Sequence, residues 1–190
     1  MKNFIKLSLV LVIISFISGL SLSWFDAIFA GKIKENTEKE IDRAITRVLP
    51  ETAAKVKLQS LPEEIKKYTV YRCFDKDSKL SGYAVVASGN GFQGKIEIMA
   101  GVSPGFDTIK NIYILSEIET PGLGSRIEDK TFAAKFRDKV VSQMTPVKGV
   151  PQAAGEIDVI TGATISSKSV IRILKADLET LAKYKIGELN

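Results

Sequence analysis

Residues 82–115 read GYAVVASGNGFQGKIEIMAGVSPGFDTIKNIYIL. Three runs rich in Val, Ile and Tyr, over residues 82–87, 95–100 and 108–115, alternate with segments of Gly, Ser, Asn, Asp and Pro. β-branched and aromatic residues favour strands, and Gly- and Pro-containing links favour turns. Because these links are short, we expect the strands to pair antiparallel. A similar run over residues 68–74 predicts a further strand just before them.

Two helices are predicted downstream of these strands. Residues 130–142 and residues 165 to about 184 carry apolar side chains at helical spacing. The first helix is expected to bury Phe132, Phe136, Val140 and Val141, and the second Val170, Ile171, Leu174, Leu178 and Leu181. Strands followed by helices predict an α+β domain, in which one antiparallel sheet is covered by helices on one face.

The N-terminal region has the character of a membrane anchor. Residues 7–25 contain no charge, and a helix over these nineteen residues spans about 28 Å, close to the thickness of a bilayer core. The run is longer than the apolar part of a signal peptide, and Ile28-Phe29-Ala30 is a poor cleavage site. We therefore expect an uncleaved transmembrane anchor over residues 1–30. Lys2 and Lys6 favour a cytoplasmic N-terminus, which places the rest of the chain outside the cytoplasm.

An amphipathic helix is expected to follow the anchor. Residues 34–49 bear apolar side chains at helical spacing, and Pro50 marks the end of this helix. Residues 31–66 are thus interpreted as an amphipathic helical connector, with a turn near Leu61-Pro62. Residues 67–190 are interpreted as the single globular domain of the 190-residue chain.

Composition excludes several chemistries. The chain contains no histidine, which excludes a Ser-His-Asp triad and a His-ligated zinc site. Its one cysteine, Cys73, excludes an intrachain disulfide and a thiolate cluster, and its strand-like surroundings predict plain packing. The formal charge of +5 is spread among alternating acidic and basic residues, so nucleic-acid binding is not expected.

The most informative stretch runs from Asp158 to Ser167 and reads DVITGATISS. A short apolar strand leads through Gly162 and Ala163 into the start of a helix. The free N–H groups and positive dipole end of that helix favour an anion, and a phosphate at Thr164 suits this arrangement. The simpler alternative is that Thr164 is an ordinary helix N-cap.

A second stretch, Glu119-Thr120-Pro121-Gly122-Leu123-Gly124, directly follows the strand over residues 108–115. Pro-Gly followed by another Gly forms a tight loop at a strand end, where a planar ligand can lie against backbone and Leu123. Alone, this stretch is an ordinary turn. Together with the Thr-Gly-Ala-Thr run it indicates a binding site.

These motifs resemble those of the covalently flavinylated FMN-binding subunits of ion-translocating electron-transport complexes. The similarity extends to the G subunit of the Rnf complex and to the C subunit of the sodium-pumping NADH:quinone reductase. The Asp-x-x-Thr-Gly-Ala-Thr run is similar to the flavinylation motif, and Glu-Thr-Pro-Gly-Leu-Gly is the other signature. Gly91-Phe92-Gln93-Gly94 and Gly101 also fit the family pattern. Glu117 departs from it, since the family usually has histidine there.

The resemblance implies a role for each matching residue. Thr164 carries FMN through a phosphoester, and Asp158, Thr161, Gly162 and Ala163 belong to the sequence that a flavin transferase reads. Glu119, Thr120 and Leu123 line the isoalloxazine ring. Ser166 and Ser167 lie near the phosphate.

It also implies a function. The chain is expected to be a single-pass cell-membrane protein whose FMN-binding domain, residues 67–190, lies on the extracytoplasmic side. It transfers electrons within an Rnf-type ferredoxin:NAD⁺ oxidoreductase that moves Na⁺ or H⁺, with other membrane subunits as partners. Two alternatives stay open: an anchored binding or sensory module of the same fold without covalent flavin, and a stand-alone flavin reductase.

Overall fold

The computed structural model describes residues 2–184 and 186, which divide into two compact units, residues 1–41 and 42–190. Met1 of the expected anchor, and residues 185 and 187–190 of the expected domain, lie outside the described residues. Most of the first unit is the long N-terminal part of helix α1, Lys2–Val48. Its apolar stretch is long enough to cross a membrane, and none of that stretch is buried. The fold therefore has the character of a membrane-anchored protein.

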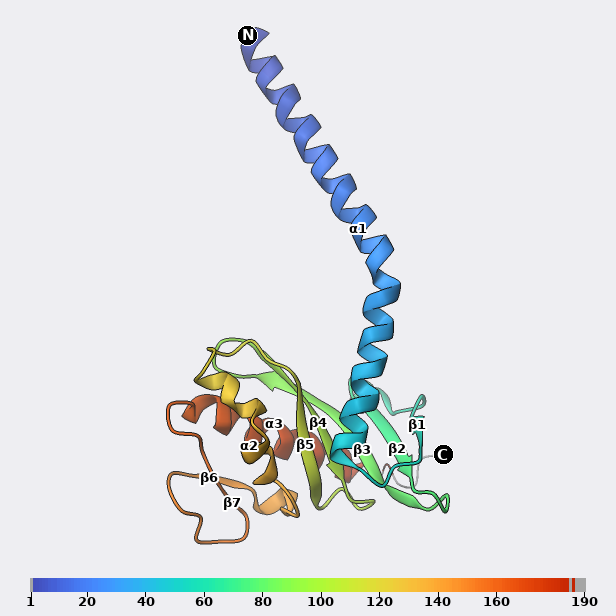
Figure 1. Ribbon diagram of the computed structural model, residues 1–190, viewed down its shortest axis with the longest axis vertical. Helices are drawn as coiled ribbons and strands as arrows, with labels where there is room; N and C mark the ends of the chain where they lie inside the picture. Colours follow the sequence, from blue (N-terminus) through green and yellow to red (C-terminus); the bar gives the residue numbers. More distant parts are fainter. Residues whose placement is uncertain (1, 185, 187–190) are drawn as a thin grey trace. The chain divides into compact units, whose positions relative to one another are not determined.

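The second unit is built on an antiparallel five-stranded sheet in the order β1-β2-β3-β4-β5 (Figure 1). The strands are β1 (Ala54–Lys57), β2 (Thr69–Phe74), β3 (Leu80–Asn90), β4 (Lys95–Val102) and β5 (Ile109–Ser116). The four strands predicted from the sequence are present, with antiparallel pairing. Strand β1 and the short 3₁₀ helix η1, Glu63–Ile65, fall within the range that we expected to be a helical connector. The helix of that range ends at Val48, and the sheet begins soon after it.

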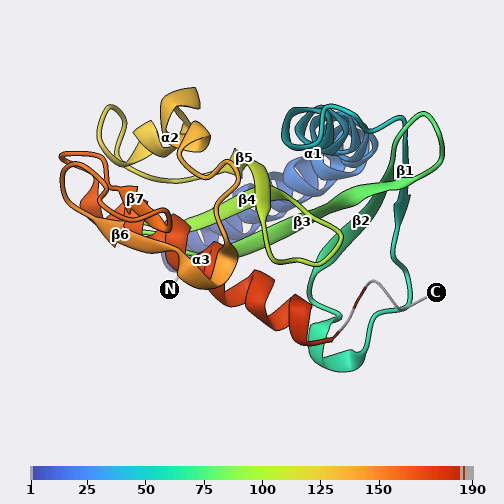
Figure 2. The same ribbon diagram turned by 90° about the horizontal axis from the view of Figure 1, so that it is seen from below.

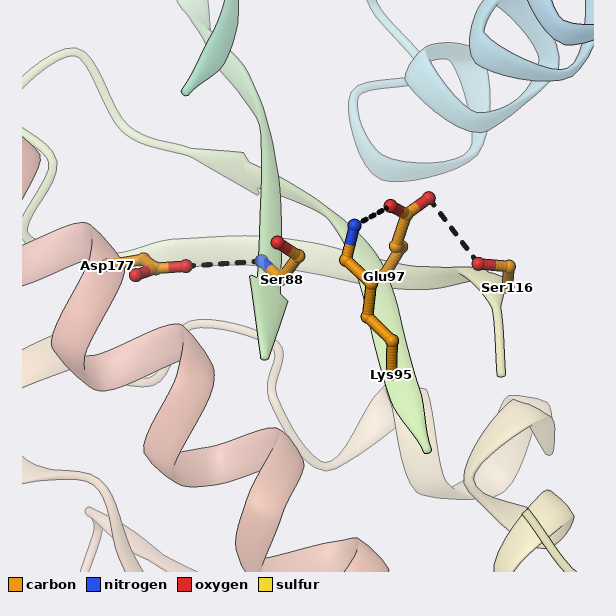
Figure 3. A network of polar contacts seen from close by, with 5 residues as sticks. All are labelled: Ser88, Lys95, Glu97, Ser116 and Asp177. Atoms are coloured by element: carbon orange, nitrogen blue, oxygen red, sulfur yellow. Dashed lines mark hydrogen bonds and ion pairs between the residues drawn. The ribbon is translucent and has the colours of Figure 1, made fainter. Parts of the chain in front are cut away.

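Helix α3, Thr164–Lys183, packs on one face of the sheet, as Figure 2 shows. Its buried residues include the five that were predicted to face inward. Asp177 ties the helix to the sheet by accepting hydrogen bonds from the Ser88 N–H at 3.2 Å and from the Tyr68 hydroxyl at 2.9 Å. Figure 3 shows Asp177 directed at Ser88 on β3. It also shows the Glu97 carboxylate on β4, which contacts both Lys95 and Ser116.

The opposite face of the sheet is covered as well, which corrects the expectation of a sheet covered on one face. The last turns of α1 bury Ala44, Ile45 and Val48, and Leu49 follows them. The alternate side chains of β2, β3 and β4, which include Tyr71, Ala84 and Met99, are buried too. The Asn111 side chain fixes this end of α1 to β5 by donating a hydrogen bond to the Arg47 carbonyl oxygen at 3.0 Å.

The predicted helix over residues 130–142 is wrong beyond its first turn. Helix α2 covers only Lys130–Ala134 and follows the 3₁₀ helix η2, Gly124–Glu128. Asp138 has φ +56°, and its N–H donates to the Ile109 carbonyl oxygen, while the Ile109 N–H donates to the Lys139 carbonyl oxygen. These hydrogen bonds to the start of β5 replace helical ones. Phe132, Phe136 and Val141 are nevertheless buried, whereas Val140 is exposed.

A small parallel ladder leads to the start of α3. After the 3₁₀ helix η3, Val141–Gln143, strand β6 (Thr145–Val147) pairs with β7 (Glu156–Asp158). The Val159 N–H extends this pairing by donating to the Val147 carbonyl oxygen. The ladder therefore sets where residues 159–163 approach the end of the sheet.

Candidate flavin site

Three loops meet at one end of the sheet. They are the turn between β3 and β4 (residues 91–94), the loop between β5 and η2 (residues 117–123), and the loop between β7 and α3 (residues 159–163). The loops enclose a cavity of about 290 Å³, at the lower end of the usual range for ligand pockets. It is lined by Phe92, Glu119, Thr120, Leu123, Gly124, Gly162, Ala163, Thr164, Ile165 and Ser166.

Both sequence motifs therefore contribute to one cavity. Glu119, Thr120 and Leu123 come from the Glu119–Gly124 stretch, and Gly162, Ala163, Thr164 and Ser166 come from the Asp158–Ser167 stretch. Thr161, Ser167 and Asp158 are not among the residues that line the cavity. Phe92, Gly124 and Ile165 also line the cavity and were not predicted as site residues. Phe92 could have been predicted, because a large apolar side chain in the glycine-rich turn Gly91-Phe92-Gln93-Gly94 is unusual.

Thr164 is the first residue of α3, and the N-cap position belongs to Ala163. Among the described residues no side chain caps this end of the helix, so the alternative of Thr164 as the N-cap is not what the structure has. The Thr164 side chain is half-buried at the cavity, and the described residues offer its hydroxyl no hydrogen bond. The N–H groups of the first turn are likewise left for a ligand.

Ser167 stabilises the loop before the helix. Its hydroxyl oxygen accepts a hydrogen bond from the Ile160 N–H at 3.1 Å, and its own N–H donates to the Ala163 carbonyl oxygen. Gly162 has φ +85°, a conformation that other residues adopt only with strain. A Cβ added at Gly162 would lie 3.3 Å from Leu123 Cδ2, so the two motifs adjoin at this point.

The Glu119 carboxylate connects the three parts of the site. Its Oε1 atom accepts hydrogen bonds from the Phe92 N–H at 2.8 Å and the Gln93 N–H at 3.1 Å. Its Oε2 atom accepts one from the Ser166 hydroxyl at 2.5 Å. The side chain of Gln93 reinforces the contact between the loops by donating to Thr120 Oγ1 at 2.7 Å. No pattern in the sequence signals this hydrogen-bond network directly.

Glu119 is 5% exposed, and its pKa nevertheless lies below the ordinary value. Burial acts to raise its pKa, but the hydrogen bonds from Ser166 and from the N–H groups of Gln93, Phe92 and Gly94 outweigh burial and lower the pKa. The carboxylate also occupies the space beside Gly124, where an added Cβ would lie 2.7 Å from Glu119 Oε2 and 2.8 Å from Ser166 Oγ. A glycine is thus required at this close approach.

Asp158 lies outside the cavity at the end of β7. Its carboxylate forms an ion pair of 2.5 Å with Lys135, whose ammonium group also donates to the Asp158 carbonyl oxygen at 3.1 Å. The Asp158 side chain is therefore partly exposed to solvent and does not line the cavity. Cys73 is buried, as predicted, and burial is the main cause of its raised pKa.

A cavity that combines an uncapped helix start, an unbonded threonine hydroxyl and apolar side chains suits a phosphate-bearing planar ligand. Residues 91–179 match the family described as FMN-binding domain. All three loops of the site lie within the matched residues.

The curated relatives are named as subunits of ion-translocating oxidoreductase complexes. The chain is 35% identical over 109 residues to the G subunit of the "Ion-translocating oxidoreductase complex" of Methanosarcina acetivorans, a match covering 57% of this chain and 56% of the relative. It is 34% identical over 113 residues to the G subunit of the "Proton-translocating ferredoxin:NAD(+) oxidoreductase complex" of Clostridium ljungdahlii, covering 60% of each. It is 27% identical over 186 residues to the G subunit of the "Na(+)-translocating ferredoxin:NAD(+) oxidoreductase complex" of Acetobacterium woodii, covering 89% of this chain and 87% of the relative. The first two matches span less than two thirds of those relatives.

Solved structures share the fold. The C subunit of the Na(+)-translocating NADH-quinone reductase from Parabacteroides distasonis superposes with a TM-score of 0.63 at 19% identity, covering 80% of this chain and 95% of that one. NqrC from Shewanella oneidensis gives a TM-score of 0.52 at 20% identity, covering 72% and 73%. The expected fold class is therefore confirmed.

Proposed function

We propose that this chain carries FMN covalently, through a phosphoester to Thr164 Oγ1, and transfers electrons within an Rnf-type complex. The observation that carries the proposal is the convergence of the two motifs on one cavity, beside which the Thr164 hydroxyl has no hydrogen bond from the described residues. Ester formation replaces the hydroxyl proton, so the modified peptide gains the mass of FMN less water. FMN supplies the electron-carrying chemistry, and the protein supplies attachment and orientation.

The residues around the cavity fit the two ends of FMN. The first-turn N–H groups of α3 and its positive dipole end suit the phosphate. Phe92, Leu123 and Ile165 are large apolar side chains that remain exposed at the cavity, and a planar ring could pack against them. Ser166 is already bonded to Glu119, and Ser167 to Ile160, so their proposed role near the phosphate is to shape the helix start.

The setting of the domain is proposed from the relatives and from α1. The relatives belong to ion-translocating oxidoreductase complexes by name, some acting on ferredoxin and NAD⁺. We extend this function to the chain: a redox subunit of a translocase, with other membrane subunits as partners and a flavin transferase that reads the Asp158–Thr164 motif. The flavin domain is placed on the extracytoplasmic side of the cell membrane, with the N-terminus cytoplasmic.

The test is mass spectrometry of denatured protein from a host that has the transferase. The peptide containing Thr164 is expected to be heavier by FMN less water. Thr164→Ala should abolish the added mass, and Thr164→Ser should retain part of it because a hydroxyl remains. Thr131→Ala is the control, since Thr131 is exposed, lies outside both motifs and does not line the cavity. An unmodified wild-type peptide would favour the binding module without covalent flavin.

Orientation has its own test. A C-terminal alkaline phosphatase fusion should be active and a C-terminal green fluorescent protein fusion dark if the flavin domain is exported through the Sec pathway. The reverse pattern would contradict the extracytoplasmic placement and leave the flavin site unaffected.

A further inference from the structure

A second groove lies within residues 42–190, between the last turn of α1, strand β5 and helix α2. It consists of two adjoining cavities of about 390 and 370 Å³, each larger than the cavity at Thr164. Arg47, Asn111 and Arg137 line both cavities, so they form the boundary between the two halves. We call this the β5 groove.

The charge of the β5 groove is predominantly positive. Arg47, Lys110, Lys130 and Arg137 line it, against Glu51 and Glu128. In the described part of the chain, Arg137 and Lys130 take part in no ion pair, and Lys110 has only a long, exposed one of 3.8 Å to Asp138. The Arg47 guanidinium lies over the Tyr113 ring at 4.6 Å, which holds it in place without neutralising its charge.

An unsatisfied acceptor lies at the centre of the groove. The Asn111 side-chain nitrogen donates to the Arg47 carbonyl oxygen, and this fixes the direction of the amide. Its Oδ1 atom is buried and has no hydrogen-bond partner among the described residues. Such a group costs about 1–3 kcal/mol unless a donor reaches it. Asn111 thus holds the end of α1 against β5, and the positive charge of the groove calls for an anionic ligand.

We propose that the β5 groove binds an acidic polypeptide segment of a neighbouring protein. Two carboxylates of the segment would pair with Arg47 and Arg137, whose guanidinium groups can bind carboxylates with two parallel hydrogen bonds. Each half of the groove also has apolar lining, Val48 and Leu49 in one and Ile112 and Ile127 in the other, which a peptide fills better than an inorganic ion does.

The position of the groove would bring a bound protein close to the candidate flavin site. Strand β5 leads from Ile112 in the groove to Ser116, about 13 Å at 3.3 Å per residue, and the loop that holds Glu119 follows it directly. A protein held in the groove would therefore be docked on the strand that carries the flavin loop. That the neighbour belongs to the same electron-transfer complex rests on the proposed function. The groove itself does not depend on it.

The first experiment uses a defined probe. A ten-residue peptide of alternating Glu and Val is titrated calorimetrically into the full chain in neutral detergent at fixed ionic strength. Arg47→Ala with Arg137→Ala should weaken binding about tenfold or more, equivalent to 1.4 kcal/mol or more. The control pair, Lys76→Ala with Lys148→Ala, removes the same charge from exposed positions outside the groove and should change binding less than twofold.

Several outcomes would overturn the proposal. Equal weakening by the control pair would show general charge attraction. Inorganic phosphate that displaces the peptide at similar concentration would show a small-anion site, and arginine-dependent binding of phosphatidylglycerol vesicles without peptide binding would show a lipid site. Arg47→Lys with Arg137→Lys guards against misfolding, because it keeps the charge and should bind the peptide with intermediate affinity.

A second experiment separates this inference from the proposed function. Arg47→Glu with Arg137→Glu is expressed together with the other proteins of the complex. The yield of the chain in the purified complex should fall at least tenfold, while the mass of the Thr164 peptide stays as in wild type. Normal assembly of this variant would contradict the docking role, whereas loss of the flavin mass alone would bear on the proposed function.

Discussion

Ser166 and Glu119, 47 residues apart in the chain, share a buried hydrogen bond of 2.5 Å between the serine hydroxyl and the glutamate Oε2 atom. This contact joins the first turn of α3 to the loop after β5. Because the same carboxylate also accepts from the turn between β3 and β4, one side chain joins two loops of the candidate flavin site to the first turn of α3.

Replacing Glu119 by Gln should therefore loosen the whole site. The amide keeps the shape, but its NH₂ group faces donors and cannot accept from them all, so we expect unfolding free energy to fall by about 1–3 kcal/mol. Flavin occupancy at Thr164 should fall as well. Thermal unfolding and mass spectrometry measure the two effects. Glu64→Gln, at an exposed position, is the control, and an E119Q variant as stable as this control would contradict the connecting role.

The lowered pKa of Glu119 predicts the direction of a pH effect. A carboxyl group whose folded-state pKa lies below the unfolded value of about 4.3 contributes stability above that value and loses it as pH falls through the folded pKa. The stability difference between wild type and E119Q should thus be constant above about pH 6 and shrink towards pH 3. Denaturant titrations of both proteins across this range give the comparison. A difference independent of pH would mean that the charge of Glu119 is not what stabilises the fold.

Gly124→Ala tests the space around the same carboxylate. The added methyl group would lie within 3 Å of Glu119 and Ser166, which forces one of them to move. We expect a loss of stability of about 1–3 kcal/mol, typical of overpacking, together with reduced flavin attachment. Gly105→Ala adds the same methyl group with ordinary contacts to Asp107 and should leave both quantities unchanged.

Asp158 offers a way to separate recognition from stability. Its ion pair with Lys135 is partly exposed, so Asp158→Asn and Lys135→Met should each change stability by less than about 1 kcal/mol. If the transferase reads Asp158 itself, the Asp158 variant should slow flavinylation while the Lys135 variant does not. The rate of flavin incorporation during timed co-expression distinguishes them. Equal slowing by both variants would assign the effect to the ion pair.

Strong local periodicity made most of the second unit predictable. The four longer strands alternate buried residues or form apolar runs, and α3 has a continuous apolar face, so these elements were identified within a few residues. Strand β1 was missed because all its residues are exposed, and only pairing with the edge of β2 makes it a strand. The short strand expected from Asp158 corresponds to β7, which lies slightly earlier in the chain. Strand β6 was missed because its parallel pairing with β7 joins short segments without any local signal.

The error at residues 130–142 has a tertiary cause. Phe132 and Phe136 have helical spacing and are both buried, but the backbone from Asp138 onward bonds to β5. The site shows the same limit. The two motifs identified most of the lining residues, whereas the role of Glu119 as a shared acceptor depends on a hairpin turn and a helix that only the folded chain brings together.

The small volume of the cavity beside Thr164, about 290 Å³, has a consequence for how the site would hold FMN attached there as proposed. A group attached to the first residue of a core-packed helix experiences an effective concentration in the millimolar range or above, however weak its non-covalent contacts are. The pocket then needs to orient the ligand and does not need to retain it. Evolution is free to leave much of the ring uncovered, and a carrier that must meet a donor and an acceptor in turn benefits from that open access.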